Sequence, residues 1–466
     1  MLKENKMGVM SVKKLVITMS LPMMVSMLVQ ALYNVVDSIF VAKVCEDALT
    51  AVSLAFPAQN LMIGVATGTG VGINALLSRS LGAKEFDRAN KVATHGIMLV
   101  LVSWFIFLTF GIFGVKLFFS SQVDSASPIY TYGTDYLFVV SALSVGLFGQ
   151  VTMERLMQAT GKTTLSMVTQ LAGAITNIIL DPIFIFDKGD ILFGNVAMPF
   201  GFGMEAKGAA AATVIGQFVA FGIGLILQVK CNKEIRLSFK GFRPDFRLVL
   251  EIYKIGVPSI IMVGIGSFMT FCLNKILLSF TSTAAAVFGV YFKLQSFVFM
   301  PVFGLNNGVI PIIAFNYGAR NKDRIMQTVR FSSTIAVSVM AIGTLLMWVM
   351  PETMLRLFEA SEDMLGIGVP ALKIISTSFV LAGFSINIGA IFMALGKSYY
   401  STIVSFARQI VVLLPSAYLL AKTGDVTNVW FAFPIAEFMS LMVTLICFFI
   451  IYRSIIRNIK PIEAKK

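Results

Sequence analysis

The segment LGAKEFDR (Leu81–Arg88) returns as YGARNKDR (Tyr317–Arg324), with its Gly, Ala, Asp and Arg in the same places and 236 positions further on. The same separation relates residues before this segment: Pro22 and Pro258, Phe56 and Phe292, Gln59 and Gln295, Gly68 and Gly304, Gly72 and Gly308. Because all these matches share one offset, the pattern indicates that the chain consists of two copies of one unit.

The composition predicts that both copies are embedded in a membrane. Apolar residues make up 57% of the chain and charged residues 13%, against about 45–50% and about 25% in soluble domains. Long runs almost free of charge recur, for example at 97–115 and 137–150. About 18 apolar residues suffice to cross the hydrocarbon layer as a helix. A soluble fold would need several cores with almost no polar surface to cover them, and the composition excludes it.

The hydrophobic runs predict twelve transmembrane helices, six in each copy. Their expected limits are 15–43, 49–78, 92–119, 130–156, 164–187, 206–229, 249–280, 284–314, 326–350, 366–394, 398–421 and 428–452. An even number of spans returns the chain to its starting side, so the copies should be parallel repeats related by an axis along the membrane normal. The predicted fold is therefore an all-α integral membrane protein with two pseudo-symmetric six-helix bundles around a central cavity. We expect an N-terminal lobe at 1–230, a cytoplasmic linker at 231–247 and a C-terminal lobe at 248–466.

The net charge of +13 is an orientation signal. Lys and Arg concentrate in segments that fall on one side of the twelve-span map, namely the N-terminus, 79–91, 230–254, 320–330 and 453–466. The positive-inside rule places both termini in the cytoplasm and the chain in the inner (cell) membrane. The lipid bilayer is thus the expected partner of this charge, and nucleic acid is not.

Two acids stand out because an ionisable group deep in a span costs several kcal/mol unless it is paired or hydrated. Asp37 precedes Lys43 by six residues, and Asp181 precedes Lys188 by seven. Both lysines mark the outer ends of outward-running spans. At about 1.5 Å per residue, both acids lie roughly 10 Å from the outer end. The sequence therefore predicts the two carboxyl groups at a similar depth.

Polar neighbours accompany each acid on its helix face. Tyr33 and Asn34 precede Asp37 by four and three residues, and Asn177 precedes Asp181 by four, which are the spacings of one helix face. A threonine enters the sixth span from its outer end. The predicted group for proton or ion coupling consists of Tyr33, Asn34, Asp37, Asn177, Asp181 and Thr213.

We expect this group to bind an ion and a cationic substrate in exchange for one another. A carboxyl group in a low-dielectric pocket can take up a proton, or it can stay charged by holding Na⁺ or a cationic ligand. A possible Na⁺ site would use Asp37, Asn177 and Asp181. A proton and a cationic substrate that compete for one carboxylate give antiport. The alternative is that both acids only form hydrogen bonds between helices, with Asp181 serving the turn that Pro182 breaks.

The second copy lacks these acids. Leu273 stands 236 positions after Asp37, and residues 411–418 near the counterpart of Asp181 contain no carboxylate. This half instead carries Lys275, Lys293, Arg408 and Glu437. Lys293 is a candidate to face the cavity, where it could pair with Glu437 or tune substrate charge. The candidate substrate-cavity residues are Gln30, Gln59, Lys293 and Gln295.

With these features the chain resembles the multidrug and toxic compound extrusion (MATE) family. The segments that carry the resemblance are 20–43, 81–89, ATGKT (159–163), NIILDPIFIF (177–186) and KLQSFVFMPVFGLNNG (293–308). It implies a secondary antiporter that exports lipophilic, often cationic drugs in exchange for H⁺ or Na⁺. The acid of the first helix, here Asp37, would handle the coupling ion, assisted by Asn177 and Asp181. NorM-type relatives also use acids in the seventh and tenth helices, which this chain lacks, so the DinF-like or MepA-like branch is favoured.

Two other classes of membrane protein are alternatives. A flippase of lipid-linked precursors from the same superfamily is the alternative transporter. A membrane-embedded enzyme would need a nucleophile–base pair or metal ligands within the spans, and the chain has one histidine, His95, which we interpret as an interfacial or packing residue. The glycines Gly64, Gly68 and Gly72 lie within an apolar span, so they predict close helix packing and not a nucleotide loop. We expect no enzyme activity, no cofactor and a monomer.

Overall fold

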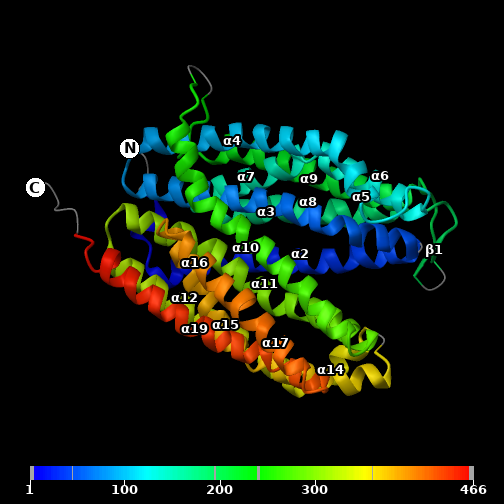
Figure 1. Ribbon diagram of the computed structural model, residues 1–466. Helices are drawn as coiled ribbons and strands as arrows, with labels where there is room; N and C mark the ends of the chain where they lie inside the picture. The colour runs from blue at the N-terminus through cyan, green and yellow to red at the C-terminus, as the bar shows by residue number, and fades with distance from the viewer. Residues whose placement is uncertain (1–4, 45, 194–195, 239–241, 359, 461–466) are drawn as a thin grey trace, which may run out of the picture. The chain divides into compact units, whose positions relative to one another are not determined.

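The computed structural model describes residues 5–44, 46–193, 196–238, 242–358 and 360–460 (Figure 1). Almost all of this part is helical. Two short strands, β1 (Ile191–Phe193) and β2 (Val196–Ala197), pair antiparallel after α8. The helices of the first copy are α1 (Lys6–Val9), α2 (Val12–Val44), α3 (Glu46–Gly82), α4 (Phe86–Thr109), η1 (Phe110–Gly114), α5 (Val115–Ser120), α6 (Pro128–Ala142), α7 (Val145–Ala159), α8 (Thr163–Ile185) and α9 (Glu205–Cys231).

The second copy repeats this order. Its helices are α10 (Phe246–Leu278), α11 (Ser282–Gly318), α12 (Lys322–Val349), α13 (Pro351–Arg356), α14 (Glu362–Ser376), α15 (Phe379–Ala394), α16 (Ser398–Phe406), η2 (Ala407–Leu413), α17 (Leu414–Ala421), α18 (Val426–Val429), α19 (Ala432–Ile451) and η3 (Tyr452–Ile456), where η marks a π-helix. Ten helices of the described chain are long and apolar enough to span a membrane, and two bent pairs bring the number to twelve. The predicted twelve-span, all-α fold is confirmed.

The fourth and tenth predicted spans are broken helices. α6 and α7 meet at a 45° bend, and α14 and α15 at a 50° bend. A break in a span frees carbonyl groups, which must find partners away from lipid. Trp104 Nε1–H donates to Ala142 O (2.9 Å), and Thr344 Oγ1–H donates to Ser376 O (2.9 Å). In both copies, a side chain from the preceding span thus satisfies the carbonyl at the break.

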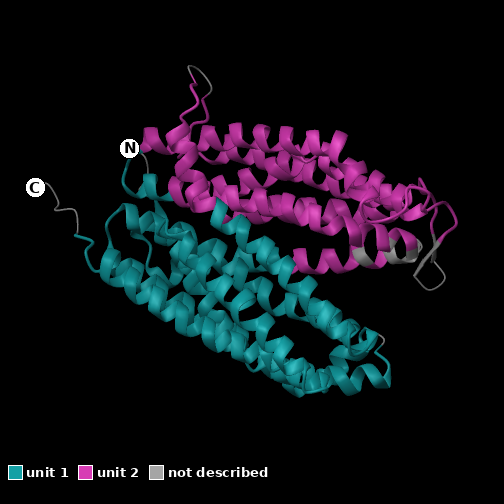
Figure 2. Cartoon of the chain, in the orientation of Figure 1, with its two compact units in different colours: residues 1–27, 78–85, 257–466 teal, residues 28–77, 86–256 magenta. Residues whose placement is uncertain are grey.

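The chain divides into two compact units, and each combines segments of both copies (Figure 2). Unit 1 comprises 1–27, 78–85 and 257–466, and unit 2 comprises 28–77 and 86–256. The first part of α2 therefore belongs to unit 1, and the first part of α10 belongs to unit 2. The predicted lobe limits at 230 and 248 stay a prediction.

Glycines explain why α2 begins in unit 1. A Cβ on Gly304 of α11 would lie 2.5 Å from Met24 Cα, and one on Gly308 would lie 2.5 Å from Ser20 Oγ. The Ser20 hydroxyl donates to Leu305 O (3.2 Å). Any side chain at the two glycine positions would push α2 away from α11. Their spacing of four residues is the small-residue pattern of close helix contacts.

Unit 2 contains the corresponding contact, between α3 of the first copy and the beginning of α10 of the second copy. A Cβ on Gly72 of α3 would lie 2.3 Å from Ile252 O of α10, and one on Gly256 would lie 2.8 Å from Gly68 O. The second long helix of each copy thus packs against the beginning of the first long helix of the other copy. The predicted glycine packing is confirmed at Gly72, Gly304 and Gly308.

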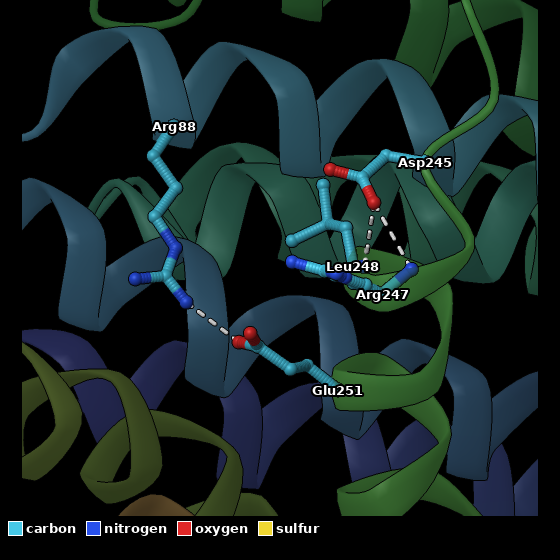
Figure 3. Close-up of polar contacts among 5 residues, drawn as sticks. All are labelled: Arg88, Asp245, Arg247, Leu248 and Glu251. Atoms are coloured by element: carbon cyan, nitrogen blue, oxygen red, sulfur yellow. Dashed lines mark hydrogen bonds and ion pairs between the residues drawn. The ribbon is translucent and has the colours of Figure 1, made fainter.

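The repeated LGAKEFDR/YGARNKDR motif holds the same two helix beginnings. In unit 1, the Arg324 guanidinium donates to Met7 O (3.0 Å) and Met10 O (2.7 Å), just before α2, and to Asn316 Oδ1 (3.1 Å). In unit 2 its counterpart Arg88 forms an ion pair with Glu251 of α10 (2.6 Å; Figure 3). The motif therefore fixes the beginning of α2 in unit 1 and the beginning of α10 in unit 2.

His95 completes the contact in unit 2. Its Nε2 accepts from the Asp245 N–H (2.8 Å), so the proton is on Nδ1, which donates to Lys91 O (2.8 Å). Asp245 caps α10 by accepting from the N–H groups of Arg247 and Leu248 (3.0 and 3.3 Å; Figure 3). His95 is buried, which agrees with its interpretation as a packing residue.

Candidate functional site

The candidate site in unit 2 begins with a close contact between α8 and α9. A Cβ on Gly173 would lie 3.0 Å from Gly216 O, and one on Gly216 would lie 2.8 Å from Gly173 O. The two backbones can approach only because both positions lack side chains. The same Gly216 faces Asn177 Cβ, at 3.3 Å from the position of an added Cβ. This packing brings Asn177 against α9.

Asn177 joins two of the predicted residues. Its Nδ2 donates to Asp181 Oδ1 (3.1 Å), one turn along α8, and to Thr213 Oγ1 (3.3 Å) on α9. Asp181 is fully buried, with 0% of its surface exposed, and Asn177 is 3% exposed. The predicted shared face of Asn177 and Asp181 and the approach of Thr213 are both present in unit 2.

Asp37 reaches the same group from α2. Its carboxylate interacts electrostatically with Asp181 and with Tyr33, which lies one turn earlier on α2. Within the described residues, Asp37 Oδ1, Asn177 Oδ1 and Asp181 Oδ2 are buried without a hydrogen-bond partner. Buried polar atoms are rarely left in this state without a ligand or water. Three oxygen atoms from two helices are therefore available to a cation or to protons.

A second tyrosine, which the sequence did not indicate, borders the group. Tyr136 of α6 interacts electrostatically with Asp37, Asp181 and Tyr33, and its hydroxyl donates to Gln59 Oε1 of α3 (3.2 Å). Gln59, predicted as a cavity residue, thus lies next to the acidic group. The remaining predicted member, Asn34, is exposed on α2, and its part in ion coupling stays a prediction.

Of the other cavity candidates, Gln30 belongs to unit 2, and Lys293 and Gln295 belong to unit 1. Gln30 accepts from Gln170 Nε2 (2.8 Å), two turns before Asn177 on α8. In unit 1, Lys293 is exposed and its Nζ lies 5.9 Å from the centre of the Phe358 ring. Gln295 is half-buried.

Sequence reasoning also missed a buried polar group on α7. Gln150 Nε2 donates to Glu154 Oε1 (3.0 Å), and Arg155 Nη1 donates to Gln158 Oε1 (2.9 Å). Glu154 and Arg155 are less than a tenth exposed. The adjacent letters ER near the end of an apolar run were the available signal, since charged residues inside a span are unusual.

The geometry of the acidic group suits small cations. Among the described residues, no set of three or more His, Cys, Asp or Glu side chains could hold a metal ion. A bound Na⁺ would therefore need the amide and hydroxyl oxygens of Asn177 and Thr213 as well as the two carboxylates. Protons need only the carboxylates. The acidic group is therefore compatible with either Na⁺ or protons.

Twelve candidate spans and a duplicated unit define a polytopic membrane protein. The MatE family model matches residues 22–183 and 258–419, so its two matches begin 236 positions apart, as the repeat predicts. The chain belongs to the MatE family. It is accordingly a membrane transporter and not an enzyme.

Individual relatives agree with this assignment over nearly the whole chain. Multidrug export protein MepA of Staphylococcus haemolyticus is 27% identical over 434 residues, covering 92% of this chain and 91% of the relative. The match supports the MepA-like branch. The fold is similar to that of a multidrug resistance MATE family transporter of the MOP superfamily in its outward-facing conformation (TM-score 0.89, 24% identity, 98% and 99% of the chains covered). It is also similar to MATE in the straight conformation (TM-score 0.90, 23% identity, 98% and 100% covered).

Proposed function

We propose that this protein is a multidrug efflux antiporter, which exports lipophilic and cationic compounds in exchange for H⁺ or Na⁺. Its relatives named as multidrug export proteins support the efflux of drugs. The observation that carries the exchange is the group formed by Asp37 and Asp181. Two acids from separate helices interact there, and three oxygen atoms of the group are buried without partners.

The coupling follows from competition. Two buried carboxylates that face each other repel, and a proton or Na⁺ between them relieves that repulsion. A cationic substrate would relieve it equally well, so ion and substrate would occupy the group in turn. Tyr33 and Tyr136 contribute hydroxyl and aromatic surface beside the carboxylates, and aromatic rings attract organic cations.

The energy available is sufficient for useful efflux. When one ion enters in exchange for a neutral compound, one charge moves through about 100 mV and releases about 2.3 kcal/mol. At about 1.4 kcal/mol per tenfold change, this sustains a concentration gradient of roughly 40-fold. In the orientation that we propose, both termini lie in the cytoplasm, the acidic group lies in the outer part of the membrane and the protein works as a monomer.

The decisive experiment is efflux of a fluorescent cation from vesicles that contain the purified protein. An inward pH gradient and an inward Na⁺ gradient are imposed separately. Efflux under one of them, and its loss in Asp37→Asn, is the expected result. The matched control is Asp47→Asn, since Asp47 is exposed at the start of α3. If neither gradient drives efflux while a lipid-linked sugar is flipped, the proposal is wrong and the protein is a flippase.

A further inference from the structure

Unit 1 contains an ion pair that the proposed site does not use. Arg408 Nη1 and Glu437 Oε1 lie 2.9 Å apart, on η2 and α19. Arg408 is the eleventh residue of the 24-residue candidate span Ser398–Ala421, so the pair lies near the middle of that span. Charges at this depth are rare, face the protein interior or water, and usually serve a function.

The face of α19 that carries Glu437 is turned away from lipid. At 100° per residue, Glu437 lies on the side of the helix opposite to its exposed apolar stripe. That stripe consists of Ile435, Phe438, Met439, Met442, Leu445, Ile446, Phe449 and Ile450. Ser440 and Thr444 share the face of Glu437 and are buried. Glu437 itself keeps 13% of its side chain exposed, so its neighbours do not enclose it completely.

A line of oxygen atoms without partners runs along this face. In the part of the chain that is described, Glu437 Oε2, Ser440 Oγ and Thr444 Oγ1 are all buried without a hydrogen-bond partner. Helical Ser and Thr usually bond to the carbonyl one turn earlier, and these two do not. Ordered water is the usual partner of such groups. The three positions lie along two helical turns, and water molecules between the helices would satisfy all three oxygen atoms.

The charges near Glu437 favour one kind of ligand. Arg408 and Tyr291 of α11 interact with it electrostatically. The other elements packed on α19 supply few titratable groups. Helix α15 has none. Lys373 of α14 and Tyr418 of α17 are exposed. On α16, Tyr399 and Tyr400 interact with each other, and Tyr399 also interacts with Cys447, ten residues beyond Glu437.

A metal ion at Glu437 Oε2 would need several oxygen ligands, and the described residues contain no set of three or more His, Cys, Asp or Glu side chains that could hold one. A proton needs only the lone pair of Oε2. The lone pair of Oε2 accepts the proton from bulk water, and the attraction between Glu437 and Arg408 is lost. The ligand that fits this carboxylate is therefore a proton.

We propose that Glu437 is a second proton-binding group of this transporter, reached along Ser440 and Thr444. Arg408 is a positioning residue whose positive charge favours the ionised form of Glu437. The sequence indicated no acid for ion binding in the seventh or tenth span of this half; the last span provides one. Proton binding by Glu437 does not depend on the proposed antiport, but its contribution to coupling does.

The first test measures protonation directly on the purified full-length protein. Dicyclohexylcarbodiimide, a hydrophobic reagent that modifies protonated carboxyl groups, is applied over a range of pH and the modified residues are mapped by mass spectrometry. Glu437 should react at low pH and lose its reactivity as the pH rises. In Arg408→Gln this loss should move to higher pH, because the guanidinium no longer favours the carboxylate.

The matched control is the exposed ion pair of Arg356 and Glu362 (3.2 Å). Arg356→Gln should leave the pH dependence of labelling at Glu437 unchanged. Absence of labelling at Glu437 at every pH, in wild type and in Arg408→Gln, would overturn the proposal. A pH dependence that Arg408→Gln leaves in place would overturn the role of Arg408.

The second test measures the proton-to-drug ratio in vesicles. Glu437→Gln combined with Arg408→Gln removes both charges, which avoids a lone buried charge that would destabilise the fold. Efflux should persist with a smaller ratio than in wild type, and an unchanged ratio would contradict a role in coupling. If no gradient drives efflux while Glu437 still reacts in a pH-dependent way, the proposed function fails and the proton site stands.

Discussion

Unit 2 and unit 1 arose from the same repeat but differ in the positions that carry charge. Asp37 and Asp181 of unit 2 correspond, at the offset of 236, to Leu273 and Ala417 of unit 1, which are both fully buried. The glycine contacts of α3 and α11, in contrast, are present in both units. The duplication thus keeps the packing of the long helices and confines the pair of facing acids to one copy.

The backbone differs as well. α8 of unit 2 is a regular helix around Asn177, whereas the corresponding part of unit 1 includes the π-helix η2. A π-helix changes the phase of the side chains that follow it and often marks a functional site. Arg408 lies in this turn, where it meets Glu437. Unit 1 therefore has one acid beside a base, and unit 2 has two acids facing each other.

The largest effect is expected when unit 2 loses the carboxylate that distinguishes it from unit 1. Asp37→Asn should reduce coupled efflux to the level of vesicles without protein, because the amide cannot take up a proton or balance a cation. Leu273→Asn at the corresponding position of unit 1 should leave coupling intact. Resistance and vesicle efflux, measured at equal expression, test both. Efflux at the wild-type rate in Asp37→Asn would reject the role of Asp37.

Substitution of the glycines that both units share is expected to lower stability by a similar amount in each unit. Gly72→Leu and Gly308→Leu should each lower the free energy of unfolding by about 1–3 kcal/mol or more, because the added side chain meets backbone or Ser20 at close range. Gly264→Leu is the control, since an added Cβ there meets nothing within 4 Å. Thermal unfolding in detergent measures the effect. Equal stability of Gly264→Leu and Gly308→Leu would argue against the contact.

A partial loss of transport is expected from Asp181→Asn. The amide oxygen still accepts from Asn177, and Asp37 remains to hold the coupling ion, so efflux should slow without being abolished. The control is Asp135→Asn, because Asp135 is half exposed in a loose ion pair with Lys207 (3.9 Å). Vesicle efflux rates separate the variants. A loss as complete as in Asp37→Asn would show that both acids are indispensable.

The smallest effect is expected at Lys293 in unit 1. Lys293→Ala should change the order of preference among cationic and neutral dyes without loss of folding, because the side chain is exposed. Lys275→Ala is the control, since Lys275 is exposed too and lies over Phe271 near the end of α10. Efflux of a dye panel gives the measurement, and an unchanged profile would exclude Lys293 from the substrate path.

The sequence predicted the spans and the repeat because lipid demands long apolar helices and because the offset of 236 is constant. It also predicted the contact of Asn177 with Asp181, which needs only one turn of a helix. The position of Tyr136 beside the acidic group was not predictable, since it depends on how the broken span of α6 and α7 packs against α2. The pairing of Arg408 with Glu437 was missed, and Lys293 was considered as the partner of Glu437 instead, because the contact depends on how two separate helices pack.

The exchange of helix beginnings between the copies has an evolutionary consequence. A single ancestral copy would have had glycines on its second long helix with no helix beginning of its own to cover them. Two identical chains could supply it to each other, as domain-swapped homodimers do. The present chain has the packing of such a swapped dimer fused end to end, and an acid in one half can differ from the other half without disturbing the shared glycine contacts.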